Sequence, residues 1–301
     1  MALGTNHVTN ATAGTFIPEL WSDEIIAAYK QNLVMANLVS KMSFKGKKGD
    51  TLHIPKPTRG AASLKAASNQ VTLQAATESE VQVLVNKHYE YSRLIEDITE
   101  VQALASLRKF YTGDAGYALA KQVDTDLVFL GRGVNGGDGT AAYTGAIIGS
   151  GNTAYTGSNA AAISDAGIRA AIQKLDDADV PMDGRVLVLP PVARNVMMGL
   201  ARFTEQAFTG EVGGGNTIRN GEIGNVYGVK VFVTTNADAA TSGDRIGLMF
   251  TKDAFVLAEQ MGVRSQTQYK QEYLGTLFTS DMLYGVKELR DEAAVAIAMP
   301  A

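Results

Sequence analysis

An unusually long run of alternating residues, from Val71 to Arg93, constrains the fold of this chain more than any other feature. Apolar or amphipathic side chains occupy one set of alternate positions and mainly polar ones the other: Val81, Val83, Val85, Lys87, Tyr89 and Tyr91 against Gln82, Asn86, His88, Glu90 and Ser92. This alternation predicts a β-strand, and at ~3.3 Å per residue Val81 to Arg93 alone would span about 40 Å. A shorter alternating segment, Thr51–Pro55, precedes it, and the residues between the two are small and polar. We therefore predict a long hairpin arm that has little core of its own and is covered by a neighbouring chain.

The composition excludes several classes of protein. The chain has 301 residues, 46% of them hydrophobic, so a sizeable core is available and wholesale disorder is excluded. The net charge is −4, whereas a dedicated nucleic-acid binder carries a strong basic excess. The absence of Cys excludes disulfides and thiolate zinc sites. No apolar run approaches the ~20 residues that span a bilayer, and no signal-peptide pattern is visible. We therefore expect a soluble protein that is made and used in cytoplasm.

Two helices are predicted in the first half of the chain. A short one begins at about Glu19, and Trp21 and Ile25 belong to its apolar stripe, which must pack on something else. A longer one runs over about 105–130. Two glycines weaken its first turns, so Asp114 is its expected N-cap, and Gly131 is expected just beyond its C-terminus.

The second half of the chain predicts a compact region of mixed helices and strands. It begins with a Gly-, Ser- and Asn-rich loop over 131–162, with a short hairpin around Ile147. The next predicted elements are a helix capped by Ser164, a strand over 185–189, a helix opened by Pro190 and Pro191, strands over 229–233 and 246–250, and a short helix opening at 252–255. An extended pair over 263–278 and a last strand from 284 to 297 complete the chain.

No motif in the chain predicts an active site. Gly131 to Gly136 matches GxGxxG, but the apolar run before it ends a helix instead of forming a strand, so a flexible loop is expected. Pro190 and Pro191 remove two backbone N–H groups where a phosphate site would need them. The three histidines, at 7, 53 and 88, lack metal-ligand spacing, and we expect Asp124 and Asp126 to be solvated. We predict no catalytic residue, no cofactor and no metal.

Four segments, in this order along the chain, resemble the major capsid proteins of tailed bacteriophages with the Hong Kong 97-type fold. They are the helix–strand unit Ile168–Leu189 and the segments Gly221–Asn236, Met249–Gln260 and Tyr284–Ile297. Each is weakly specific alone, and the four together, within a match over about 18–298, are fairly specific.

The resemblance implies an α+β fold with a set order of parts. These are an N-terminal arm (1–45), an extended E-loop hairpin with peripheral-domain strands (46–96), a spine helix with the Gly-rich loop of the peripheral domain (97–162), an axial domain (163–260) and C-terminal strands shared between peripheral and axial domains (261–301). The loop over 131–162 departs from the pattern, and the resemblance gives it no place.

The resemblance also implies a function: a coat protein that self-assembles, as hexamers and pentamers, into the icosahedral shell around the genome of a tailed double-stranded DNA phage. The implied partners are further copies of the chain and scaffolding and portal proteins, with a decoration protein left open. Packaged DNA is expected to bind weakly and non-specifically, and no membrane is involved. The implied location is the virion, after assembly in the bacterial host cytoplasm.

Two alternatives remain open at this stage. One is an encapsulin-like compartment shell, and the other, from a different class, is an α/β nucleotide-binding enzyme. For the shell, the predicted inter-subunit contacts are Trp21, Ile25, Arg59, Lys65, Asn69, Leu73, Val81, Phe208 and Tyr273.

Overall fold

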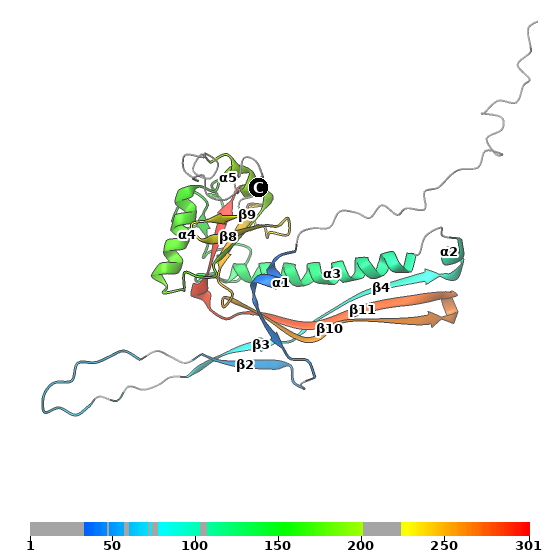
Figure 1. Cartoon of the computed structure of the whole chain (residues 1–301), viewed down its shortest axis with the longest axis horizontal. Coiled ribbons are helices and arrows are strands. Elements are labelled where there is room, and N and C mark those ends of the chain that lie inside the picture. Colours follow the sequence, from blue (N-terminus) through cyan, green and yellow to red (C-terminus); the bar gives the residue numbers. More distant parts are fainter. Residues whose placement is uncertain are drawn as a thin grey trace, which may run out of the picture.

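A computed structural model describes residues 33–46, 48–56, 60–71, 73, 78–102, 107–200 and 224–301 of the chain. The predicted helix at Glu19 and four predicted contacts, Trp21, Ile25, Arg59 and Phe208, lie outside these residues. The molecule is elongated, with a compact body at one end, a long helix lying along a sheet, and a hairpin below (Figure 1). No helix in the described ranges is long and apolar enough to cross a membrane.

The elongated part is a four-stranded sheet with one helix lying along it. The strand order is β1 (Ser40–Ser43), β10 (Phe255–Lys270), β11 (Gly275–Glu288) and β4 (Lys87–Glu96). Helix α3 (Leu107–Phe129) runs the length of this sheet, with α1 (Met35–Leu38) beside it and α2 (Asp97–Gln102) near its start (Figure 1). Between helix and sheet lie buried side chains such as Leu127 and Tyr284, and Tyr284 stacks on Tyr89 with ring centroids 5.9 Å apart.

The compact body is a six-stranded sheet with two helices. Its strand order is β5 (Ile147–Ile148), β12 (Ala294–Met299), β9 (Arg245–Phe250), β6 (Val186–Leu189), β8 (Val229–Val233) and β7 (Asn225–Val226). Helices α4 (Asp165–Asp177) and α5 (Pro191–Met198) pack on it through buried residues such as Ile168 and Leu187. As predicted, the Ser164 hydroxyl caps α4 and accepts the Gly167 N–H at 3.2 Å.

The predicted hairpin is confirmed, but its second strand is shorter than the sequence suggested. Strands β2 (Thr51–Lys56) and β3 (Ser79–Leu84) pair antiparallel, and the predicted faces are right, since Val83 is buried and Leu84 is half exposed. The chain then leaves the hairpin and enters the other sheet as β4. At this point the backbone of Leu84 crosses β11 very closely. A Cβ atom added at Gly285 would lie 2.2 Å from the carbonyl oxygen of Leu84, so only glycine fits there. The alternating run is therefore two strands in two sheets.

The predicted extent of the long helix, about 105–130, is close to that of α3, but both of its predicted caps are wrong. Helix α3 begins at Leu107 and passes through Gly113 and Gly116 without a break, and the Asp114 carboxylate accepts the Tyr91 hydroxyl at 3.0 Å. At the other end, Gly131 lies within a 3₁₀ turn, η2 (Leu130–Arg132), and not in a left-handed cap. Its Cβ would lie 2.5 Å from a methyl carbon of Leu248, so this glycine permits close packing.

Three other predictions near the body need correction. Residues 252–254 form a turn, and Phe255 already belongs to β10, because it pairs with Glu288 of β11. The predicted last strand is divided by the 3₁₀ turn η4 (Asp291–Ala293) into β11 and β12, which belong to different sheets. The short hairpin around Ile147 is reduced to one antiparallel bridge, between Ile147 and Ala154, with the Tyr155 N–H donating to the Ala146 carbonyl at 2.9 Å, and strand β5 also pairs parallel with β12.

Candidate assembly surfaces and their anchors

The segment between β2 and β3, residues 57–78, is here called the hairpin extension, and its described residues, 60–71, 73 and 78, project well beyond the body (Figure 1). In its described part no strand forms and every residue is exposed. Leu64 and Leu73 are 101% and 92% exposed, and Val71 is also exposed. Lys65 and Asn69 share this surface, and Val81, at its base in β3, is half-buried. The extension therefore offers apolar side chains that a single subunit leaves in water.

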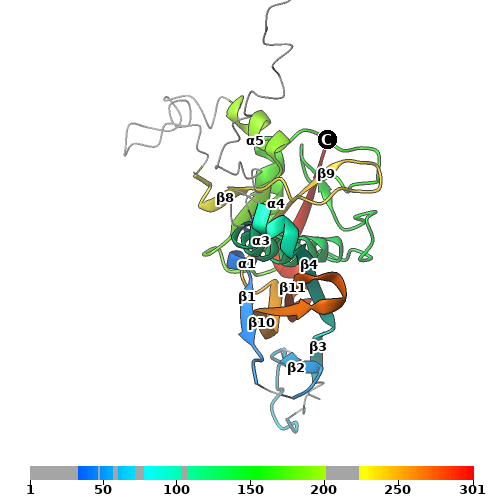
Figure 2. The ribbon, with the colours of Figure 1, turned by 90° about the vertical axis from the view of Figure 1, so that its right-hand side faces the viewer.

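A second apolar surface lies at the far end of the four-stranded sheet, and we call it the sheet tip. It consists of the 3₁₀ turn η3 (Gln271–Tyr273), Leu274 and Ile98, with Tyr273, Leu274 and Ile98 all more than 60% exposed. The Asp97 N–H donates to the Leu274 carbonyl at 3.0 Å, which holds the start of α2 against the turn. Figure 2 views the molecule from this end, with η3 in orange at the front.

Two buried carboxylates on α3 fix the helix to the rest of the subunit, contrary to the predicted solvation of Asp124 and Asp126. Asp124 is fully buried, and it accepts the Met35 N–H at 2.8 Å and the Asn236 amide at 3.0 Å. Burial raises its pKa above the ordinary value. Asp126 accepts the Tyr284 hydroxyl at 2.6 Å and pairs with Lys87 at 3.1 Å. The helix is thus tied to α1 on one side and to the sheet on the other.

The signal for this burial was present in the sequence. Asp126 is three residues after Val123 and one before Leu127, so it borders the apolar stripe of the helix. Asp124, one residue after Val123 and three before Leu127, borders the stripe in the same way, but the local pattern does not reveal its partners, which lie 89 and 112 residues away.

The Gly-rich loop over 131–162 packs against the body through two tyrosines. The Tyr143 side chain is buried, and its hydroxyl donates to Asp238 at 2.5 Å, where Arg132 also binds at 2.7 and 3.1 Å. Burial, reinforced by Asp238, raises the pKa of Tyr143. Tyr155 bonds to Asp244 at 2.7 Å in the same manner. The loop is therefore an ordered part of the body.

The described residues offer little for enzyme chemistry. Gly131 and Gly133 of the GxGxxG match follow a helix, and the next regular element is strand β5, so the strand–loop–helix arrangement of a dinucleotide site is not formed there. Within the described ranges no group of three His, Cys, Asp or Glu residues could hold a metal ion.

Comparison with known proteins decides the family. A family model described as phage capsid protein matches residues 97–297, which is more than half of the chain. The chain belongs to the phage capsid protein family. None of the curated protein sequences compared with it matches.

Solved capsid structures share the fold over almost the whole length. A chain from Mycobacterium phage Che8 is 25% identical, with a TM-score of 0.75, and the match covers 94% of this chain and 97% of that one. The capsid of cyanophage P-SCSP1u is 19% identical, with a TM-score of 0.76, and the match covers 99% of this chain and 96% of that one. The capsid of a native GTA particle is 11% identical, with a TM-score of 0.67, and the match covers 99% of this chain and 100% of that one.

These findings confirm the predicted α+β fold of the Hong Kong 97 type and the predicted role. The protein is a major capsid protein of a tailed phage, and its role in the virion shell is structural. The inter-subunit roles of Lys65, Asn69, Leu73, Val81 and Tyr273 stay predictions.

Proposed function

We propose that this coat protein assembles into hexamers and pentamers in which the hairpin extension of one subunit lies on its neighbour. The observation that carries the proposal is the exposure of Leu64, Val71 and Leu73 on a segment without a core. Burying a leucine side chain contributes roughly 1.5–3 kcal/mol, so a neighbour that covers these residues gains substantial stability. Lys65, Asn69 and Val81 contribute at the same contact, and Tyr273 contributes at the sheet tip. Trp21, Ile25, Arg59 and Phe208 complete the proposed contacts.

The two sheets support a division into a peripheral and an axial domain. In this proposal the four-stranded sheet with α3 is peripheral, and the six-stranded sheet with α4 and α5 is axial. The axial sheet takes β12 and β5 from outside 163–260, and the proposed boundary at 260 falls within β10. Sheet membership is therefore a better guide to the division than sequence ranges.

The partners beyond the shell follow from the same role. Scaffolding and portal proteins act with the coat protein in the bacterial host cytoplasm, where the shell is built. Packaged DNA is held weakly and with steep dependence on salt, because a chain with a net charge of −4 offers no general basic surface.

A single charge in the hairpin extension tests the proposed contact. Leu73→Asp should reduce the yield of closed particles about tenfold or more, because an unpaired carboxylate would be buried against the neighbour. Ser63→Asp adds the same charge at an exposed polar position and should assemble far better. Both variants should melt as the wild-type subunit does. Particle counts by electron microscopy give the measurement, and normal assembly of the Leu73→Asp variant would contradict the proposed contact.

A further inference from the structure

Strand β4 forms an open edge of the four-stranded sheet. It is 10 residues long, and it pairs with β11 from Lys87 to Glu96 without a register shift. Among the described residues no strand pairs with its other side, and no backbone hydrogen bond from a loop covers it there. A long, regular edge with unpaired N–H and C=O groups is a template for a strand of another chain.

The free backbone groups of β4 belong to alternate residues. The Asp97 N–H, just beyond the strand, donates to the Leu274 carbonyl at 3.0 Å, so odd-numbered residues direct their backbone groups toward β11. Because antiparallel strands alternate in this respect, the even-numbered residues direct theirs outward. All of these even-numbered residues are exposed: His88, Glu90, Ser92, Leu94 and Glu96.

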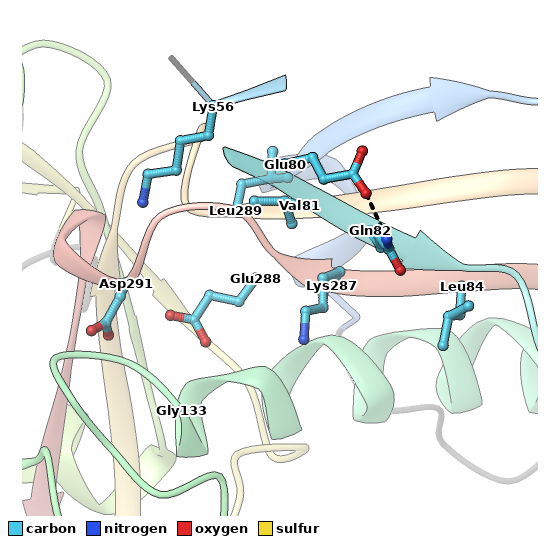
Figure 3. A pocket seen from close by; sticks show the side chains of 10 residues that line it. All are labelled: Lys56, Glu80, Val81, Gln82, Leu84, Gly133, Lys287, Glu288, Leu289 and Asp291. Carbon is cyan, nitrogen blue, oxygen red and sulfur yellow. Dashed lines mark hydrogen bonds between the residues drawn. The ribbon is translucent and has the colours of Figure 1, made fainter. Parts of the chain in front are cut away.

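The other strands do not offer a comparable edge. Strand β10 carries two register shifts between Glu259 and Arg264, and such bulges discourage edge pairing. Strand β2 contains Pro55, which has no N–H to donate. Strand β3 borders a cleft of about 670 Å³ whose lining includes Lys287 and Glu288 of its own subunit (Figure 3). In the described part of the chain, β4 is therefore the longest regular edge that is left open.

We infer that β4 pairs antiparallel with β4 of a second subunit across a two-fold axis, so that two four-stranded sheets become one continuous sheet. The same surface is used on both subunits, as a two-fold axis requires. An axis between edge-paired antiparallel strands is perpendicular to the sheet, so α3 covers the same face in both subunits. The inference goes beyond the contact proposed for the hairpin extension and uses none of its residues.

The charges of β4 select the register of this pairing. Opposing residues in such a pair have numbers of constant sum, and their side chains share one face of the sheet. When Ser92 lies opposite itself, Glu96 lies opposite the partner subunit's His88. In the same register Arg93 lies opposite the partner subunit's Tyr91, which places a cation beside an aromatic ring. No like charges oppose each other within the strand.

The neighbouring registers are less favourable. Centring the pair on Arg93 places this cation opposite itself and Glu90 opposite Glu96. Centring it on Glu90 places Lys87 opposite Arg93. Like charges directly opposite each other are destabilising. Centring it on Tyr91 avoids like charges, but Glu96 then has no opposing residue within the strand. The register centred on Ser92 is therefore the expected one.

A disulfide across the two-fold axis tests the pairing. The chain has no Cys, so Ser92→Cys introduces a single thiol. Opposing Cα atoms at a hydrogen-bonded position are about 5.5 Å apart, a separation that a disulfide spans. Gln266→Cys is the matched control, because Gln266 is exposed and pairs with Thr279, which pairs with Ser92. After mild oxidation of assembled particles, Ser92→Cys should give about tenfold more disulfide-linked dimer on a non-reducing gel than the control.

Removal of one backbone N–H gives a second test. Ser92→Pro removes an outward N–H at the centre of the pairing, a position where an edge strand tolerates proline. Ser92→Ala keeps this N–H and is the control. Both subunits should melt near the wild-type temperature. Since symmetry removes two hydrogen bonds, the Pro variant should yield about tenfold fewer closed particles than the Ala variant.

Equal amounts of dimer from the two Cys variants, or equal particle yields from the Pro and Ala variants, would overturn the inference. If Ser92→Pro does not fold, the disulfide measurement decides alone. These variants leave the hairpin extension unchanged. Normal assembly of Leu73→Asp would therefore refute the extension contact without affecting the disulfide result, and particles that lack the disulfide would refute only the pairing of β4.

Discussion

Replacing residues 57–78 by a short Gly-Ser link should abolish shells and leave the subunit folded. Lys56 and Ser79 are paired at the end of the β2–β3 ladder, so a tight turn can join them without disturbing the hairpin base. The described residues of the extension are exposed and contribute nothing to the three hydrophobic clusters of the core. Their removal should therefore take away contacts between subunits and few within one.

Circular dichroism and thermal melting measure the fold of this variant, and electron microscopy measures its assembly. We expect a melting temperature within about 2 °C of the wild type, which corresponds to roughly 1 kcal/mol for a chain of this size, and no closed particles. A Gly-Ser segment of the original length is the control. It should also fail to form shells, because it restores the length of the extension but not its apolar side chains. Normal shells from the short variant, or loss of its fold, would refute the role given to the extension.

The largest effect on subunit stability is expected at Asp126. Changing it to Ala leaves the Tyr284 hydroxyl without its 2.6 Å acceptor and Lys87 without its partner at 3.1 Å, between helix α3 and the sheet. Removing one member of a buried pair costs about 3–5 kcal/mol. Because Lys87 is partly exposed, we expect a loss of stability at the lower end of this range, about 3 kcal/mol.

Denaturant unfolding of unassembled subunits gives this measurement. Asp126→Asn keeps an oxygen that accepts the Tyr284 hydroxyl, so it should lose clearly less stability than the Ala variant. Glu259→Ala removes an exposed ion pair with Lys45 and should change stability by less than about 1 kcal/mol. If Asp126→Ala loses no more stability than Glu259→Ala, the contacts of Asp126 are not what holds α3 to the sheet.

The elements that the sequence predicted well are those with a local cause. The Ser164 hydroxyl caps α4 through a residue three positions away, and the alternation around Val83 gives the correct buried face. The loop at 131–162 was recognised by its composition, but its packing was not, because Tyr143 meets Asp238 across 95 residues.

The elements that were missed depend on distant partners. The alternating run changes sheet after Leu84 because Gly285, some 200 residues later, allows the two backbones to cross. Residues 252–255 look like the start of a helix, but Phe255 is drawn into pairing with Glu288. Helix α3 keeps both of its glycines because its buried face, fixed by Asp124 and Asp126, outweighs their low helix propensity.

The most direct test of the central claim is the assembly state of the purified full-length chain. Light scattering and electron microscopy, with the chain expressed alone at high concentration and together with its scaffold, should show closed icosahedral shells or capsomer rings. The exposed apolar residues of the hairpin extension and the sheet tip require such partners. A monodisperse monomer under all of these conditions would contradict the account.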